Sequence, residues 1–251
     1  MDRISLSLLA ACLIPTATTP VVAQEENTKA GDDNNLQITV YGWLAGATGE
    51  LRPFAGAPTL EFDNSFGEVL GDLDAAFFAS GQLRRDRLVV VADVSYASLS
   101  REGRVPPGIA ASANVSQLAI SALAGARVED SDALTVDLLA GARIWDLDGR
   151  VEVPLVGVAL VPGKTFVDPV VAARFNAPLA PRVSALLHTD IGGFGIGSDF
   201  TYQVVATANY RASDQFYISA GWRHLHLDYS DAGTVFKGSQ TGPIIGATYR
   251  F

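Results

Sequence analysis

Three features of this 251-residue sequence predict an all-β protein built as a single antiparallel transmembrane β-barrel of about ten strands. Apolar and polar residues alternate along segments of ten or more residues, tight polar turns alternate with longer links, and the chain ends on an aromatic residue in phase with the last segment. A membrane-crossing strand needs about 9–11 residues, whereas strands of soluble sandwiches usually have about five or six. The length of the segments therefore favours a membrane barrel.

Composition and charge exclude several other classes of protein. Hydrophobic residues make up 48% of the chain, yet beyond residue 23 no apolar run approaches the roughly 18 residues of a spanning helix. The formal net charge of −9 argues against a nucleic-acid partner. The only cysteine, Cys12, lies near the N-terminus, so we expect neither a disulfide scaffold nor a cysteine-ligated metal in the exported chain.

Residues 1–23 predict a secretory signal peptide. Arg3 supplies a basic start, Ile4 to Ile14 form a short apolar core, and a small-x-small pattern precedes cleavage between Ala23 and Gln24. An alternative interpretation is a lipoprotein signal in which Cys12 is acylated. Residues 24–35 are polar and acidic and predict a disordered tail, which leaves 36–251 for the barrel.

Ten segments carry the strand pattern. In one of them Val136, Ala140 and Ile144 alternate with Asp137 and Arg143, so the two faces differ in polarity. Eight or twelve strands are the alternatives, because the first segment and the region 151–161 are ambiguous. The latter could be a hairpin projecting beyond the membrane, and residues 65–70 could form one helical turn. The predicted strands are 36–50, 74–84, 87–100, 112–127, 133–147, 165–178, 182–195, 199–211, 215–229 and 239–251.

The links between these segments alternate in length. Four are tight and polar, at 84–87, 129–132, 179–182 and 212–214, and between them lie mostly longer links at 52–73, 102–110, 148–164 and 230–238, with a short one at 195–198. Outer-membrane barrels have short periplasmic turns and longer external loops. An even strand number then places both ends of the barrel on the periplasmic side.

The C-terminal segment provides a further signal. Ile245, Ala247, Tyr249 and Phe251 share one face of the last predicted strand. A terminal Phe with alternate apolar residues resembles the recognition signal of bacterial outer-membrane barrels. The resemblance implies a Gram-negative outer-membrane location, assembly by the barrel assembly machinery, and contact with outer-membrane lipid and lipopolysaccharide. The alternative is an ordinary strand that happens to end on an aromatic residue.

Further motifs resemble a set of small, functionally uncharacterised outer-membrane barrel proteins of Gram-negative bacteria. The similarity is most extensive over residues 165–251, and where that family usually has Tyr before the Arg of the penultimate strand this sequence has Trp222. The resemblance implies fold and location but no activity. The matching stretches are Tyr41-Gly42-Trp43, Gly141-Ala142-Arg143-Ile144-Trp145, Val167-Asp168-Pro169, Ala173-Arg174, Thr189-Asp190-Ile191-Gly192-Gly193-Phe194-Gly195, Gly197-Ser198-Asp199, Gly221-Trp222-Arg223, Asp228-Tyr229 and Gly242-Pro243-Ile244-Ile245-Gly246.

When the alternation is extended along every predicted strand, the residues on the polar faces form a lumen whose positive and negative charges nearly balance. Buried charges must be paired, and Arg suits this because its fork binds a carboxylate through two hydrogen bonds. We expect a structural barrel with a salt-bridged lumen or, alternatively, a narrow passive channel for small solutes. The predicted lumen residues are Arg84, Asp93, Arg127, Asp137, Arg143, Asp168, Arg174, Arg182, His188, Asp190, Asp199, Arg223 and Arg250.

Catalytic and metal sites are weakly indicated. His188 and Asp190 share a face, but Ser184 lies some 13 Å further along the strand, at about 3.3 Å per residue. A nucleophile would thus have to come from a neighbouring strand, and a lipid- or peptide-hydrolysing barrel enzyme is the second hypothesis for the function. A soluble periplasmic β-protein is the third. His224 and His226 have a spacing that could hold a metal, although interfacial side chains are the simpler interpretation. We expect no cofactor and no metal.

Overall fold

The computed structural model describes residues 34–251 except 53, 106–108, 154–157 and 161–162. The described residues belong to one compact unit, Asp32–Phe251. The predicted signal peptide, with its cleavage site at Ala23 and Gln24, lies outside the described residues. Within the described part of the chain, no helix is long and apolar enough to span a membrane.

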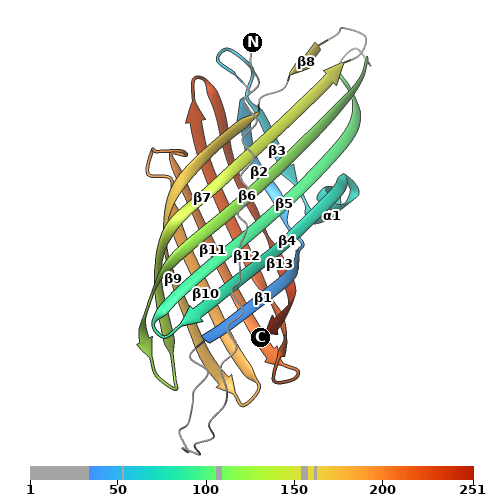
Figure 1. The fold of residues 1–251 in the computed structure, drawn as a ribbon. Helices are drawn as coiled ribbons and strands as arrows, with labels where there is room; N and C mark the ends of the chain where they lie inside the picture. Colours follow the sequence, from blue (N-terminus) through green and yellow to red (C-terminus); the bar gives the residue numbers. More distant parts are fainter. Residues whose placement is uncertain (1–33, 53, 106–108, 154–157, 161–162) are drawn as a thin grey trace, which may run out of the picture. The chain divides into compact units, whose positions relative to one another are not determined.

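Ten antiparallel strands of the described chain close into a barrel, which confirms the predicted fold class and strand number (Figure 1). Each strand pairs with the next in sequence, and the first pairs with the last through Gln37↔Arg250 to Trp43↔Ile244. The strands are β1 (Asn34–Trp43), β4 (Leu73–Arg85), β5 (Leu88–Val105), β6 (Ile109–Asp130), β7 (Thr135–Val153), β9 (Lys164–Ala180), β10 (Val183–Gly192), β11 (Phe200–Arg211), β12 (Phe216–Asp231) and β13 (Thr234–Arg250).

The two ends of the barrel differ as the link lengths predict. β1 starts and β13 finishes at the end where short turns join β4 to β5, β6 to β7, β9 to β10 and β11 to β12, and we call this the turn end. The opposite end, called the loop end, carries the three longest links, from β1 to β4, from β7 to β9 and from β10 to β11, whereas Ala232 and Gly233 alone join β12 to β13 there. It also carries a hairpin of β2 (Gly46–Arg52) and β3 (Leu60–Asn64), of which β2 pairs with β13.

The outward face of the strands is apolar. Leu36, Ile38 and Val40 project outward from β1, and Ile218 and Trp222 do so from β12, all between 40% and 56% exposed. Such side chains have no partner in water, and a continuous apolar exterior is the pattern of a barrel that contacts lipid. The intervening residues point inward, where they form the interior described below.

The first predicted strand is divided into β1 and β2 by an irregularity at Leu44 and Ala45. Pro243 lies opposite this break, and because proline has no N–H it cannot donate to the neighbouring strand. The Leu44 N–H still donates to the Pro243 carbonyl at 2.9 Å. The chain therefore bends here without losing contact with β13.

The predicted helical turn is present as α1 (Phe66–Gly71). Ser65 caps it, because its hydroxyl accepts from the Glu68 N–H while its own backbone N–H donates to the Glu68 carboxylate at 2.8 Å. Hydrogen bonds from the Ser65 hydroxyl and backbone hold the pKa of Glu68 below its ordinary value. The region 151–161, interpreted as a hairpin, contains the end of β7 and β8 (Val158–Leu160), which pairs with it.

Several strands continue further towards the loop end than the sequence predicts. β5, β6 and β7 have 18, 22 and 19 residues, well beyond the membrane requirement of about 9–11. The predicted links 102–110, 148–164 and 230–238 are therefore largely strand. Outside the lipid no strand needs an apolar exterior, so the alternation that marks a strand in lipid is not enforced there.

Candidate functional site

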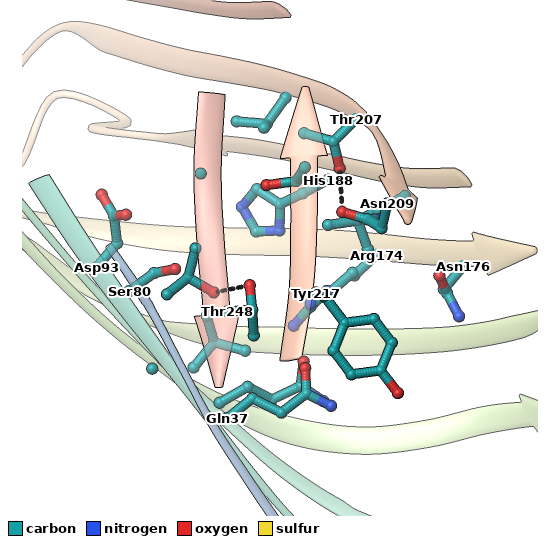
Figure 2. A pocket seen from close by; sticks show the side chains of 18 of the residues that line it. Gln37, Ser80, Asp93, Arg174, Asn176, His188, Thr207, Asn209, Tyr217 and Thr248 are labelled. Carbon is teal, nitrogen blue, oxygen red and sulfur yellow. Dashed lines mark hydrogen bonds between the residues drawn. The ribbon is translucent and has the colours of Figure 1, made fainter. Parts of the chain in front are cut away.

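A polar cavity of about 360 Å³ lies inside the barrel and reaches its turn end. Asn35 and Arg250, close to the two ends of the barrel chain, both line it. Figure 2 shows Arg174 and His188 among the polar side chains that several strands direct into this space. The cavity is therefore enclosed by the wall of the barrel itself.

Asp190 on β10 is the centre of a buried network beside this cavity. Its Oδ2 accepts from Arg143 Nη2 on β7 at 2.9 Å and from Gln203 Nε2 on β11 at 2.9 Å, and it lies 3.1 Å from His188 Nε2. Arg143 also donates from Nε to the Ser121 hydroxyl at 2.8 Å. The network thus joins four strands around one buried ion pair.

A second network crosses the lumen. Asp93 on β5 accepts from the Tyr41 hydroxyl on β1 at 2.7 Å and from Arg223 Nη2 on β12 at 3.3 Å. β5 and β12 are not neighbours in the sheet, so this ion pair spans the interior. The Arg223 guanidinium also lies over the Trp43 ring, 4.6 Å from its centroid.

At the turn end the charges are only partly paired. Arg127 binds Asp137 through two hydrogen bonds, of 2.8 Å from Nε and 3.4 Å from Nη2. Arg174 lies opposite Asp137 and His188 in the strand register, but it makes no hydrogen bond or ion pair with any residue that the structure describes. Arg250 stacks over the Tyr217 ring at 5.0 Å, and its buried Nε has no hydrogen-bond partner within the same part of the chain.

Above the polar networks, towards the loop end, aromatic and aliphatic side chains fill the lumen. Phe166 stacks on Tyr229 with ring centroids 4.3 Å apart, and Trp145 stacks on Phe166 at 6.3 Å. Trp145 is only 1% exposed. We call this cluster the aromatic plug; it consists of Trp43, Ala119, Trp145, Leu225, Leu227 and Tyr229, with Tyr41, Ala45, Phe78, Leu147, Phe166, Phe236 and Ile244 packed against it.

An amide pair beside the aromatic plug also crosses the lumen. Gln117 on β6 and Gln240 on β13 each donate to the other's side-chain oxygen, at 3.3 Å and 3.1 Å. These strands lie on different sides of the barrel. A space of only about 30 Å³ lies among Trp145, Leu225 and the same glutamines, so the interior is narrow at this level.

Asp168 ties the aromatic plug to the link between β10 and β11. Its carboxylate accepts from the Trp145 indole N–H at 2.9 Å, from the Ser198 backbone N–H at 2.6 Å and from the Ser198 hydroxyl at 2.7 Å. Gly193 has a φ of +87°, a conformation that glycine adopts without strain. The glycine-rich stretch at 192–197 is thus a tight link closed by hydrogen bonds.

The structure distributes the predicted lumen residues over three places. Arg182 and Asp199 lie outside the interior: both are exposed, Arg182 at the short turn after β9 and Asp199 in the link before β11, where it accepts from the Ser230 hydroxyl. Alternation cannot hold at these positions because each lies beyond the end of its strand. Arg143, Asp168 and Asp190 are buried beside or above the cavity, and the remainder line it: Arg84, Asp93, Arg127, Asp137, Arg174, His188, Arg223 and Arg250.

The candidate catalytic pair is formed, but no nucleophile joins it. His188 and Asp190 are in contact, and Ser184 lines the same cavity, yet no hydrogen bond connects His188 to a hydroxyl among the described residues. His224 and His226 lie outside the lumen, where His224 Nε2 is 3.0 Å from the Tyr202 hydroxyl and His226 Nδ1 is 2.9 Å from the Ser239 hydroxyl. In the described chain no group of three or more metal-binding side chains is assembled.

The C-terminal residues of the predicted assembly signal share the outward face. Ile245, Tyr249 and Phe251 are 58%, 41% and 64% exposed, and Ala247 is exposed between them. Their pairing with the assembly machinery stays a prediction.

Sequence reasoning missed the aromatic plug. Trp145 follows Asp137 and Arg143 in strict alternation, and Tyr229 follows Arg223 in the same way, so the phase of the charged residues marks these rings as inward. Large aromatic residues in such a barrel are more readily assigned to the lipid interface. The phase of the alternation was the signal that could have identified them.

No family model and no curated protein matches this chain. Among solved structures, the outer-membrane protease OmpT of Escherichia coli is similar, with a TM-score of 0.49 and 12% identity over 87% of this chain and 97% of that one. The translocator domain of the autotransporter NalP of Neisseria meningitidis has a TM-score of 0.47 and 12% identity, over 86% of this chain and 88% of its own. The attachment invasion locus protein Ail of Yersinia pestis has a TM-score of 0.40 and 12% identity, over 87% and 98%. These neighbours are β-barrels of Gram-negative outer membranes, and this chain, by its own strand pairing, is a closed antiparallel barrel.

Proposed function

We propose that this protein is a structural outer-membrane barrel whose lumen is closed to solutes in its loop-end half. The observation that carries the proposal is the set of contacts that cross the lumen between strands that are not neighbours. Arg223 meets Asp93 at 3.3 Å, and Gln117 meets Gln240 at 3.1 and 3.3 Å. A solute moving along the lumen would have to break both contacts and displace the aromatic rings between them.

The location rests on the exterior of the barrel. The outward side chains of all parts of the sheet include large apolar residues, such as Leu138 on β7 and Ile245 on β13, which are 51% and 58% exposed. Removing such surface from water is favourable by about 25 cal/mol per Å², so a lipid surrounding stabilises this exterior and water does not. Short turns of outer-membrane barrels face the periplasm. With the turn end on that side, the projecting ends of β5, β6 and β7 face the outside of the cell.

A bilayer recording tests the closed lumen. The protein is refolded, its folded state is verified by heat-modifiable migration in gels, and its conductance is measured in planar bilayers. We expect no stable conductance steps. Stable steps from the unaltered protein that change in an Arg174→Ala variant would contradict the proposal, because they would establish the alternative function, a narrow channel with Arg174 in its lumen.

The same preparation tests the membrane location. Bacterial membranes that contain the protein are extracted with salt and then with detergent. Retention until detergent is added is expected for a lipid-embedded barrel, whereas release by salt alone would favour the alternative of a soluble periplasmic β-protein.

A further inference from the structure

The cavity at the turn end carries more positive than negative charge. Two aspartates, Asp93 and Asp137, line it together with five arginines, Arg84, Arg127, Arg174, Arg223 and Arg250. Arg84 is the last but one residue of β4, at the turn end; without it, four arginines still face two aspartates. The whole chain, by contrast, has a net charge of −9. The positive charge is thus concentrated inside a chain that is otherwise acidic.

Both aspartates are already engaged by arginines of the same cavity. Asp93 is paired with Arg223, and Asp137 accepts from Nε and Nη2 of Arg127, whose Nη1 donates to Asp130. Arg174 and Arg250 make no ion pair with a carboxylate of the described chain, although Asp137 lies opposite Arg174 in the strand register. Charged groups held in a partly enclosed space are costly when unpaired, so two guanidinium groups in this state indicate a counterion that binds from solution.

The position of the two cations defines the shape of a ligand. Arg250 is the last residue of β13 and lies at the turn end, whereas Arg174 lies further inside, paired in register with His188. A ligand with two or more anionic groups can engage both guanidinium groups. Hydroxyl and amide side chains from the surrounding strands, among them Thr248, Asn209 and Asn176, line the same cavity and can donate to the ligand's oxygens (Figure 2).

We propose that this cavity binds a small soluble anion with two or more carboxylate or phosphate groups, which enters from the turn end. The volume of about 360 Å³ lies at the lower end of the range of about 300–1,000 Å³ found for small-molecule sites. Guanidinium groups bind carboxylates and phosphates through paired hydrogen bonds, which gives Arg174 its role in the site. The aromatic plug above the cavity makes it a blind site, so binding does not require passage through the barrel.

Calorimetric titration of the full barrel in an uncharged detergent at low salt tests this site. The probes are citrate for carboxylates, pyrophosphate for phosphates, and sucrose as an uncharged solute. We expect citrate or pyrophosphate to bind with one-to-one stoichiometry and sucrose not to bind. The affinity should fall as salt is added, because partly exposed charge interactions are screened.

Two single substitutions separate a site from a general charge effect. Arg174→Gln should weaken binding at least tenfold, while Arg182→Gln, which removes the same charge from an exposed position at the same end, should leave it within twofold. Because Arg174 has no hydrogen bond to lose in the described chain and its unpaired charge is costly, its variant should unfold at an equal or higher denaturant concentration, which verifies that the cavity is intact.

Three results would overturn the inference. The first is the absence of binding by both anions, the second is binding that Arg174→Gln and Arg182→Gln weaken equally, and the third is binding of sucrose with the affinity of the anions. A comparison of citrate with pyrophosphate then decides which of the two anionic groups the cavity prefers. None of these outcomes depends on whether the barrel conducts.

Discussion

The two halves of the barrel interior differ in how fully their charged side chains are paired. Towards the loop end, rings and aliphatic side chains pack against one another, and the buried Asp168 carboxylate has three hydrogen bonds. Towards the turn end, Arg174 has no hydrogen bond and the Arg250 Nε is buried without a partner in the described chain. The turn-end half also has a packed cluster, of Val89, Leu123, Leu139, Val170 and Ala172, but beside it the cavity keeps arginines without ion-pair partners in the described chain.

The contrast indicates which half carries stability and which carries a binding function. Dense packing and satisfied polar groups stabilise a fold, whereas an unpaired cation in a confined space destabilises it. Residues that lower stability are often kept because they bind something. The predictions below test this division, beginning with the largest effect.

The strongest effect is expected from Trp145→Ala in the aromatic plug. The substitution empties a fully buried site and removes a hydrogen-bond donor from Asp168, so the free energy of unfolding should fall by about 4 kcal/mol. Trp222→Ala is the matched control, since that ring is 53% exposed on the outward face: its removal loses lipid contact and a hydrogen bond to Thr241 but leaves no buried cavity, so it should cost less than Trp145→Ala.

Urea titration of the barrel refolded in lipid vesicles measures both tryptophan variants. Equal losses of unfolding free energy would contradict the view that the rings inside the lumen, and not those at the lipid face, hold the barrel together.

A smaller but still large effect is expected where the two halves meet, at Asp190. Asp190→Leu leaves the buried Arg143 guanidinium without its carboxylate, and breaking such a pair costs about 3 kcal/mol or more. The double variant Arg143→Met with Asp190→Leu removes both charges and should recover most of that loss. The same urea titration applies, and a double variant no more stable than the single one would show that the ion pair itself stabilises the barrel.

The large-scale architecture could be predicted from sequence because a barrel in lipid enforces one rule on every strand. Each outward position must be apolar, so the alternation runs without interruption, as in Val136 to Ile144. The number of strands, the alternation of turns and links and the capped helical turn at Ser65 all follow from such local rules.

The interior could be predicted only in part, because its contacts join strands that are distant in the sequence. Alternation shows that Arg223 and Asp93 point inward, but only the closed barrel brings them within 3.3 Å of each other. The alternation also predicts that Arg174 points inward, but Arg174 forms no ion pair in the described chain. Which charges pair, and which remain, depends on the diameter and stagger of the barrel, and these cannot be inferred from a single strand.

The division of the interior is tested most directly by the reactivity of cysteines placed in its two halves. In a Cys12→Ser background, which removes the only native cysteine, Ser184→Cys lines the cavity and Ala119→Cys lies in the aromatic plug, 4% exposed. A small negatively charged thiosulfonate reagent is added to the folded barrel, and the rate of modification is followed by mass. We predict that the cysteine at position 184 reacts at least about tenfold faster than the one at 119, because thiol modification follows exposure and positive surroundings. Equal rates in folded protein would contradict a closed loop-end half above an open, positively charged cavity.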